Sequence, residues 1–101
     1  MKKATSALLI RSDSTARRVK PLKKEFTLEE LQGFIGGNIE IVRLPSGLSM
    51  VVHEIGKALG LPKNERATAI WQKEFPLDKY PDNNDSLIVG DVVLAEEHLI
   101  K

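Results

Sequence analysis

Short runs of apolar and β-branched residues, separated by turn residues, recur along the chain. The most extended pair is Ile39–Leu44 and Leu48–His53, which flank Pro45-Ser46-Gly47. Proline pre-sets φ at the first corner position, and Gly47 has access to the left-handed conformation that closes a three-residue hairpin with a bulge. We therefore expect a central β-hairpin over residues 39–53, with the rest of the chain packed on or beside it.

A shorter pair of runs comes before this hairpin. Ala7–Arg11 and Arg17–Leu22 are separated by the turn residues Asp13-Ser14-Thr15. Proline lacks the amide that a central strand donates, so Pro21 confines the second run to a sheet edge or ends it. The pattern predicts an N-terminal hairpin whose second strand is an edge strand.

The clearest helix signal begins at Phe26. Thr27 and Glu30 have the spacing of a capping box, and Phe26 is placed to pack on Leu31 as a hydrophobic staple. Apolar residues then share one face as far as Ile35. The Gly36-Gly37 pair is typical of a helix stop, because glycine adopts the left-handed conformation without a Cβ penalty. We expect a helix over Thr27–Ile35.

The middle of the chain is less regular. His53–Gly60 fits either a short helix or a turn through Gly56-Lys57, and the turn is the favoured interpretation. A second short helix is predicted at Asn64–Gln72, because Asn64 is a good N-cap and Glu65 suits the positive end of the helix dipole.

The C-terminal part combines a long loop with a strand. Residues 73–86 are rich in Pro, Asp and Asn and predict a loop held by nearby aromatic residues, namely Trp71, Phe75 and Tyr80. Leu87–Ala95 reads as a buried strand interrupted at Gly90 by a bulge or tight turn. Residues 1–6 and 97–101 are expected to be flexible tails.

Together these elements predict one α+β domain over residues 1–101. We expect a twisted, mostly antiparallel sheet of four to five strands packed on the Thr27–Ile35 helix, with the second short helix at one end. The chain of 101 residues, 42% of them hydrophobic, is long enough for one modest core.

Composition limits the chemistry. The sequence has no cysteine, which excludes a disulfide framework and a thiolate nucleophile. No apolar run approaches the ~20 residues that span a bilayer, and a cytoplasmic protein is expected. His53 and His98 are far apart in sequence, and no metal is assigned to them. Three aspartates hint at calcium but lack the EF-hand spacing, namely Asp78, Asp82 and Asp85.

Charge is unevenly distributed along the chain. Eight of the 15 Lys/Arg and two of the 14 Asp/Glu lie in residues 1–25, so this segment carries +6 and the remainder carries −5. A basic segment of this kind suits contacts with nucleic-acid phosphates. The alternative is a charged edge strand that blocks aggregation, and it is favoured because no aromatic residue is interleaved as a stacking platform. The candidate nucleic-acid-binding residues are Arg17, Arg18, Lys20, Lys23 and Lys24.

A second candidate site lies at the start of the second predicted helix. Free amides at a helix N-terminus, beside the Lys63 and Arg66 cations and the Thr68 hydroxyl, suit a phosphate or carboxylate ligand. The alternative is purely structural: Asn64 caps the helix, Arg66 pairs with a local acid and Thr68 bonds back to the helix. The structural alternative is favoured, because such caps and pairs are common on ordinary surfaces.

The order of the short motifs resembles a small domain-of-unknown-function family found in phages, prophages, plasmids and other mobile elements. The resemblance covers about Ala7 to Ala95 and rests on a helix ending in Gly-Gly, an "IE-V" strand, an N-x-R-A-T segment and a closing "VGD" strand. The matching positions are Gly36, Gly37, Ile39, Glu40, Asn64, Arg66, Ala67, Thr68, Gly90 and Asp91. The long basic N-terminal stretch and the Phe75–Asp85 segment depart from that pattern. The resemblance implies an accessory protein made inside a bacterial cell and transfers no activity.

Two classes of function follow. The first is a non-enzymatic phage or mobile-element protein that binds and inhibits or sequesters a host protein or a small phosphorylated signal, with a counter-defence role. The second is a nucleic-acid-binding accessory protein that uses the basic N-terminal hairpin. An enzyme ranks below both, because no residue pair has the spacing of an oriented nucleophile or acid–base couple. No cofactor and no membrane partner are expected, and the exposed strand edges are compatible with a homodimer.

Overall fold

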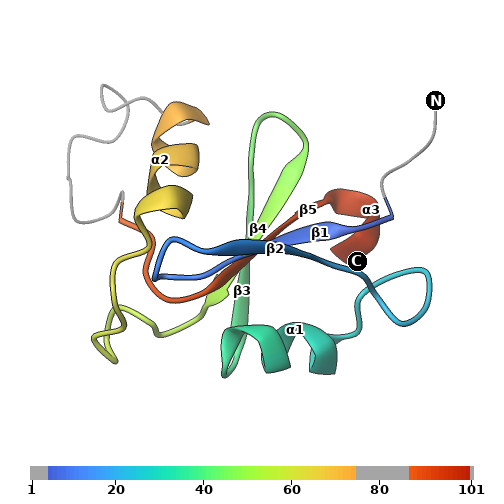
Figure 1. Ribbon diagram of the computed structural model, residues 1–101, viewed down its shortest axis with the longest axis horizontal. Coiled ribbons are helices and arrows are strands. Elements are labelled where there is room, and N and C mark those ends of the chain that lie inside the picture. The colour runs from blue at the N-terminus through green and yellow to red at the C-terminus, as the bar shows by residue number, and fades with distance from the viewer. Residues whose placement is uncertain (1–4, 75–86, 101) are drawn as a thin grey trace.

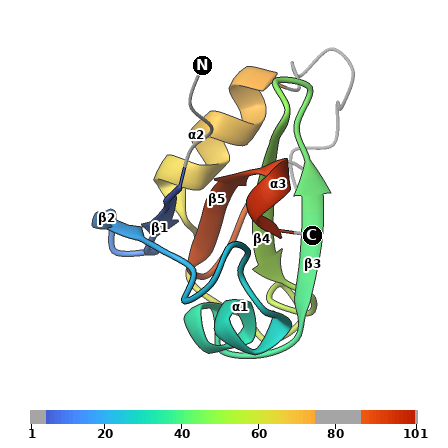
Figure 2. The same cartoon turned by 90° about the vertical axis from the view of Figure 1, so that its right-hand side faces the viewer.

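The computed structural model describes residues 5–74 and 87–100, which form a five-stranded antiparallel sheet flanked by helices (Figures 1 and 2). The strands are β1 (Ala7–Ile10), β2 (Ala16–Val19), β3 (Ile39–Arg43), β4 (Leu48–His53) and β5 (Val92–Glu96). The helices are α1 (Leu28–Ile35), α2 (Glu65–Glu74) and α3 (Glu97–Ile100). The predicted α+β fold with an antiparallel sheet is confirmed.

The last strand of the chain lies at the centre of the sheet. The strand order is β2-β1-β5-β4-β3, so β5 pairs with β1 through Leu9↔Val93 and with β4 through Val51↔Val93. Val92 and Val93 are both fully buried, because each face of β5 is covered. The expectation that the β3–β4 hairpin is the centre of the structure is therefore wrong, since β3 is an edge strand.

Both predicted hairpins are present. In the β3–β4 turn, the Leu44 amide donates to the Leu48 carbonyl oxygen at 2.8 Å and the Gly47 amide to the Leu44 carbonyl oxygen at 3.0 Å. Gly47 has a φ of 95°, as a three-residue loop closed by a left-handed residue requires. The N-terminal hairpin pairs β1 with β2, and β2 ends at Val19, before Pro21.

The N-terminal turn is held by Asp13. Its Oδ1 accepts the Thr15 hydroxyl at 2.6 Å and the Thr15 amide at 2.9 Å. These hydrogen bonds favour the ionised carboxylate and hold the pKa of Asp13 below its ordinary value.

Helix α1 begins and ends as the sequence predicts. Thr27 Oγ1 accepts the Glu30 amide at 3.1 Å and Glu30 Oε1 accepts the Thr27 amide at 2.8 Å, which completes the capping box. Gly36 ends the helix with a φ of 88°. Its neighbour Gly37 has a different reason to be glycine, since a Cβ there would lie 2.5 Å from Nε2 of His53.

The sheet has a hydrophobic core on each face. On the first face, α1 and α3 cover a cluster that includes Leu9, Leu31, Val51, Val93 and Leu99. On the second face, α2 covers Ile10, Met50 and Val92 with Ala67 and Trp71. The second helix, expected at one end of the sheet, thus packs on the face opposite α1.

The C-terminal residues correct another expectation. Residues 97–100, predicted to belong to a flexible tail, form α3, with Leu99 and Ile100 buried. The Leu99 carbonyl oxygen also accepts the Phe26 amide at 2.8 Å. Helix α3 follows β5 directly and packs on the first face of the sheet, so Leu99 and Ile100 join the hydrophobic core there. Of the other predicted tail, Ser6 accepts a hydrogen bond from Arg18 and residues 1–4 lie outside the described range.

The connections around α2 follow the predictions in part. Residues 54–60 form successive turns, in agreement with the favoured interpretation, and His53 is the last residue of β4. Gly90, with a φ of 74°, separates β5 from Val89, which bridges to Lys63. Lys73 and Glu74 belong to α2 rather than to the predicted loop. Residues 75–86, including Phe75, Tyr80 and the three aspartates, lie outside the described residues.

Candidate functional site

Asn64 is a buried junction between α2 and the sheet. Its side chain is fully buried, and Oδ1 accepts the Ala67 amide at 3.0 Å, which caps the first turn of α2. Nδ2 donates to the carbonyl oxygens of Ile10 and Gly90, both at 2.9 Å. The Asn64 amide side chain therefore joins the end of β1, the entry to β5 and the start of α2.

The Thr68 side chain is likewise buried and hydrogen-bonded to the backbone. Only 4% of it is exposed, and Oγ1 accepts the Ile88 amide at 2.9 Å and donates to the Ile88 carbonyl oxygen at 3.2 Å. Both hydrogen bonds join the Thr68 hydroxyl to the segment before β5, and not to the preceding turn of α2 as the structural alternative had it. Asn64 and Thr68 thus hold the 87–91 segment against α2.

The two cations of the predicted anion site do not converge with these groups. Arg66 is exposed, and its Nη1 donates to the Ser14 carbonyl oxygen at 3.0 Å, across the N-terminal turn. Lys63 is also exposed, with its backbone bridged to Val89. The structure brings Asn64 and Thr68 together inside the protein and leaves Lys63 and Arg66 on its surface, an arrangement that favours the structural alternative.

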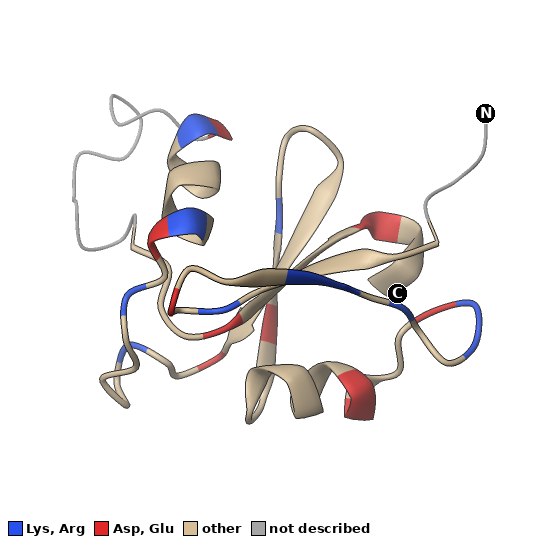
Figure 3. Cartoon of the chain, viewed as in Figure 1, with Lys and Arg blue, Asp and Glu red and all other residues tan. Residues whose placement is uncertain are grey.

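The basic residues of the predicted nucleic-acid site lie on the edge strand β2 of the sheet and in the connection that follows it (Figure 3). Arg17 and Arg18 lie on the edge strand β2 and, as neighbours in a strand, point to opposite faces of the sheet. Arg18 Nη1 donates to Oγ of Ser6 at 3.1 Å. The remaining three cations lie in the exposed connection between β2 and α1, namely Lys20, Lys23 and Lys24.

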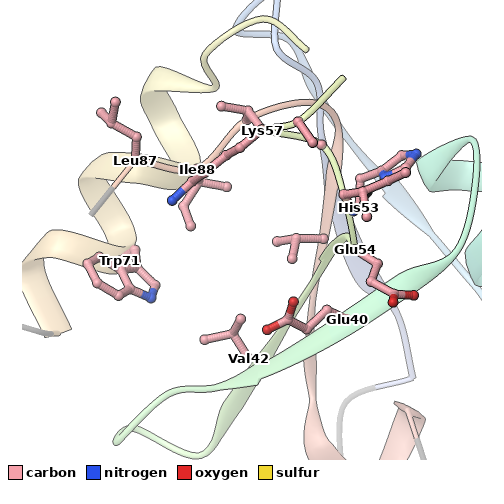
Figure 4. A pocket seen from close by; sticks show the side chains of 13 residues that line it. Glu40, Val42, His53, Glu54, Lys57, Trp71, Leu87 and Ile88 are labelled. Carbon is pink, nitrogen blue, oxygen red and sulfur yellow. Dashed lines mark hydrogen bonds between the residues drawn. The ribbon is translucent and has the colours of Figure 1, made fainter. Parts of the chain in front are cut away.

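The structure also contains a cavity of about 500 Å³ between α2, strands β3 and β4, and residues 53–58 and 87–89 (Figure 4). Its apolar walls come from four different segments, namely Val42, Val52, Trp71 and Ile88. Figure 4 shows the Trp71 ring on the α2 side, with Lys57 and Glu40 approaching the opening from other sides. The shape is that of a hydrophobic pocket with charged groups at its rim.

The rim of this pocket carries charges of both signs. Glu40, Glu54 and Lys57 line it, and in Figure 4 the Glu40 carboxylate and the Lys57 ammonium lie on the side of Trp71, whereas the Glu54 carboxylate points away from it. A partner that places an apolar group in the pocket and a cation beside it would therefore be complementary. This pocket is absent from the sequence-based predictions, although one signal for it exists: Glu40 shares a strand face with the apolar Val42 and Leu44.

Other site types receive no support from the described part of the chain. Within residues 5–74 and 87–100, no group of three His, Asp or Glu side chains has the arrangement of a metal site. No helix in these residues has the length and apolar character needed to cross a bilayer.

Comparison with known proteins places the chain in a family. The protein belongs to the family described as Domain of unknown function (DUF3846), whose profile matches residues 1–98. No curated protein and no solved structure shows a significant match to it. The resemblance to a family of unknown function is confirmed at this level.

Proposed function

We propose that this member of the DUF3846 family is a non-enzymatic accessory protein of a phage or mobile element that binds a protein of its host bacterium. Binding inhibits or sequesters the host factor in the cytoplasm, and a counter-defence role fits such an activity. The observation that carries the proposal is the hydrophobic pocket of about 500 Å³ beside β3, with Trp71 in its wall. A pocket of this kind accommodates the buried apolar anchor of a protein interface.

A protein partner suits the geometry better than a phosphorylated small molecule does. The Glu40 carboxylate lies beside the pocket and repels a phosphate there, and a single ammonium, that of Lys57, accompanies it. At the start of α2, the side-chain groups of Asn64 and Thr68 already bond to the backbone. Neither place offers a phosphate the convergent donors that it requires.

A capture experiment tests the proposal. The tagged wild-type protein is incubated with lysate of a bacterial host beside Val42→Arg, which introduces a long charged side chain into the pocket wall. The matched control is Leu22→Arg, which places the same side chain at a position that is 88% exposed and outside the pocket. We expect one host protein to bind the wild type and Leu22→Arg, and to bind Val42→Arg at least about tenfold more weakly.

Two results would contradict this proposal. Equal capture by Val42→Arg, with its fold verified by circular dichroism, would show that the pocket is not the binding site. A thermal shift with phosphorylated nucleotides that survives high salt, with no host protein captured, would make a small phosphorylated ligand the better assignment.

A nucleic-acid-binding function is the second candidate, favoured by the five cations on β2 and in the connection after it (Figure 3). If Arg17, Arg18, Lys20, Lys23 and Lys24 all contact phosphates, the logarithm of the binding constant should fall with the logarithm of salt concentration at a slope of about −4 to −5. Replacing all five by glutamine should abolish this dependence. Replacing Lys73, which lies on α2, is the control. A duplex affinity unchanged by the five replacements would exclude this edge.

A further inference from the structure

The outer edge of β3 presents a regular row of main-chain groups. The Leu44 amide donates to the Leu48 carbonyl oxygen, and the Glu54 amide donates to the Asn38 carbonyl oxygen at 2.9 Å, at the two ends of the β3–β4 pair. In an antiparallel pair, hydrogen-bonded positions alternate along each strand. The groups of Glu40 and Val42 therefore point to β4, and those of Ile39, Ile41 and Arg43 point away from it.

This edge has the properties of a strand-pairing site. Among the described residues, no strand pairs with the outer side of β3. Ile41, in the middle of the row, is 37% exposed. The opposite edge differs, because Arg17 and Arg18 occupy the middle of the shorter strand β2 and charged edges resist pairing. Alternating amides and carbonyls in a row are satisfied best by another extended chain.

The open edge and the hydrophobic pocket are continuous. Glu40 and Val42, which line the pocket, belong to the edge strand itself and lie on the second face of the sheet. A strand added to β3 directs every second side chain to that face, with cross-strand Cβ atoms ~4.5–5.5 Å apart. One of its side chains would therefore lie beside the pocket opening without any change in backbone direction.

We propose that the outer edge of β3 binds an extended segment of the partner protein as a sixth strand, with one large apolar side chain of that segment in the pocket. Lys or Arg on the same face of the segment, two residues from the apolar one, is complementary to Glu40. Main-chain hydrogen bonds supply affinity, while the pocket and the carboxylates supply specificity. The inference rests on the proposed function, since it names the form in which the host protein is recognised.

A second copy of this chain is a poorer occupant of the edge. Antiparallel pairing of β3 with itself satisfies all the outward groups when Ile41 lies opposite its own equivalent. In that register Glu40 of each copy lies diagonally across from the other on the same face, and the two carboxylates repel each other. The occupant that the charges favour is a basic segment rather than β3.

The test uses a displayed library of random dodecapeptides, selected on the wild-type protein and counter-selected on Val42→Arg. We expect the selected peptides to combine a large apolar residue with Lys or Arg an even number of positions away. Hydrogen–deuterium exchange by NMR then locates the peptide. The amides of Ile39, Ile41 and Arg43 should exchange rapidly in the free protein and at least about tenfold more slowly in the complex. Those of Glu40 and Val42, already bonded to β4, are the internal control.

A pair of variants tests the main-chain bonds directly. Ile41→Pro removes one outward amide, at an edge position where proline is tolerated, and should weaken peptide binding about tenfold. Ile41→Thr keeps the amide and the β-branched shape and should bind like the wild type. If Ile41→Pro does not fold, the hydrogen–deuterium exchange measured on the wild-type protein still tests the main-chain bonds.

The outcomes separate the two proposals. Peptides that bind but leave the three outward amides unprotected, or a library from which nothing is selected, would overturn strand addition. If the host protein is still captured through Val42, the proposed function stands without it. Protection of these amides without peptide, in a wild-type protein that sediments as a dimer, would make a second copy the occupant and overturn the inference.

Discussion

Replacing Asn64 by alanine should destabilise the protein more than most single substitutions do. The change removes the cap of α2, which is worth about 1 kcal/mol. It also removes the two buried hydrogen bonds that Nδ2 donates to the carbonyl oxygens of Ile10 and Gly90, at about 1–3 kcal/mol for each. Allowing for partial relaxation, the expected loss is about 3–5 kcal/mol, a large part of the ~5–15 kcal/mol typical of such a domain.

Urea denaturation followed by far-ultraviolet circular dichroism measures this loss. In a thermal melt of the same variant, the melting temperature should fall by at least about 12 °C, since 1 kcal/mol corresponds to ~4–8 °C in a domain near this size. The control is Ser46→Ala, which removes an exposed hydroxyl bonded to Glu74 at 2.8 Å and should change stability by no more than about 0.5 kcal/mol. A loss for Asn64→Ala below about 1 kcal/mol would refute the assignment of Asn64 as a structural junction.

Asn64→Asp separates the donor from the acceptor role. The carboxylate still accepts the Ala67 amide, but it directs a charged oxygen at two carbonyl oxygens in a buried site. Burial and these neighbours should raise the pKa of the introduced carboxyl in the folded state. Relative to the wild type, the variant should therefore be most stable in acid and lose stability as the pH rises above the ordinary aspartate pKa of about 4. A difference from the wild type that shrinks over that range would contradict the reasoning.

Three further predictions concern α1 and α3. Gly33→Ala, where the new methyl group has open space within helix α1, should stabilise the protein by about 0.5–1 kcal/mol. Gly36→Ala, at a φ of 88°, should destabilise it by a similar amount. Thermal melts should therefore show a raised melting temperature for the first variant and a lowered one for the second. Hydrogen bonds from the amides of Thr27 and Leu22 hold the pKa of Glu30 below its ordinary value, so the stability they contribute is present above pH 4.5 and lost in stronger acid. Glu30→Gln should flatten the acid limb of a stability–pH curve. Leu99→Ala should cost about 2–5 kcal/mol in urea denaturation, a result that a flexible C-terminal tail would not produce.

Elements with local causes were predictable. The capping box of α1 involves residues three apart, and the β3–β4 turn depends on Pro45 and Gly47 within the turn itself. Both formed as predicted, because their stabilising groups are neighbours in sequence. The predicted cap at Asn64 was also correct, for the same reason.

The candidate pocket could not be predicted from residues that are neighbours in sequence. Its walls come from β3, β4, α2 and the segment before β5, so no spacing along the chain identifies it. The structural role of Thr68 could not be predicted from its neighbours either, because its hydroxyl bonds to Ile88, 20 positions away, and not to its own helix. The residues considered as an anion site therefore use their buried polar groups for structure, as the favoured alternative had it, but through contacts distant in sequence.

The sequence by itself determined the four strands of the two hairpins, helices α1 and α2, where α1 begins and ends, and how the two hairpins turn, because hydrogen bonds and steric preferences within a few residues decide these features. Only the tertiary structure decided that β5 lies at the centre of the sheet and β3 at its edge. It also decided that residues 97–100 enter the core. These outcomes depend on which apolar faces cover one another, and that competition involves residues from the whole chain.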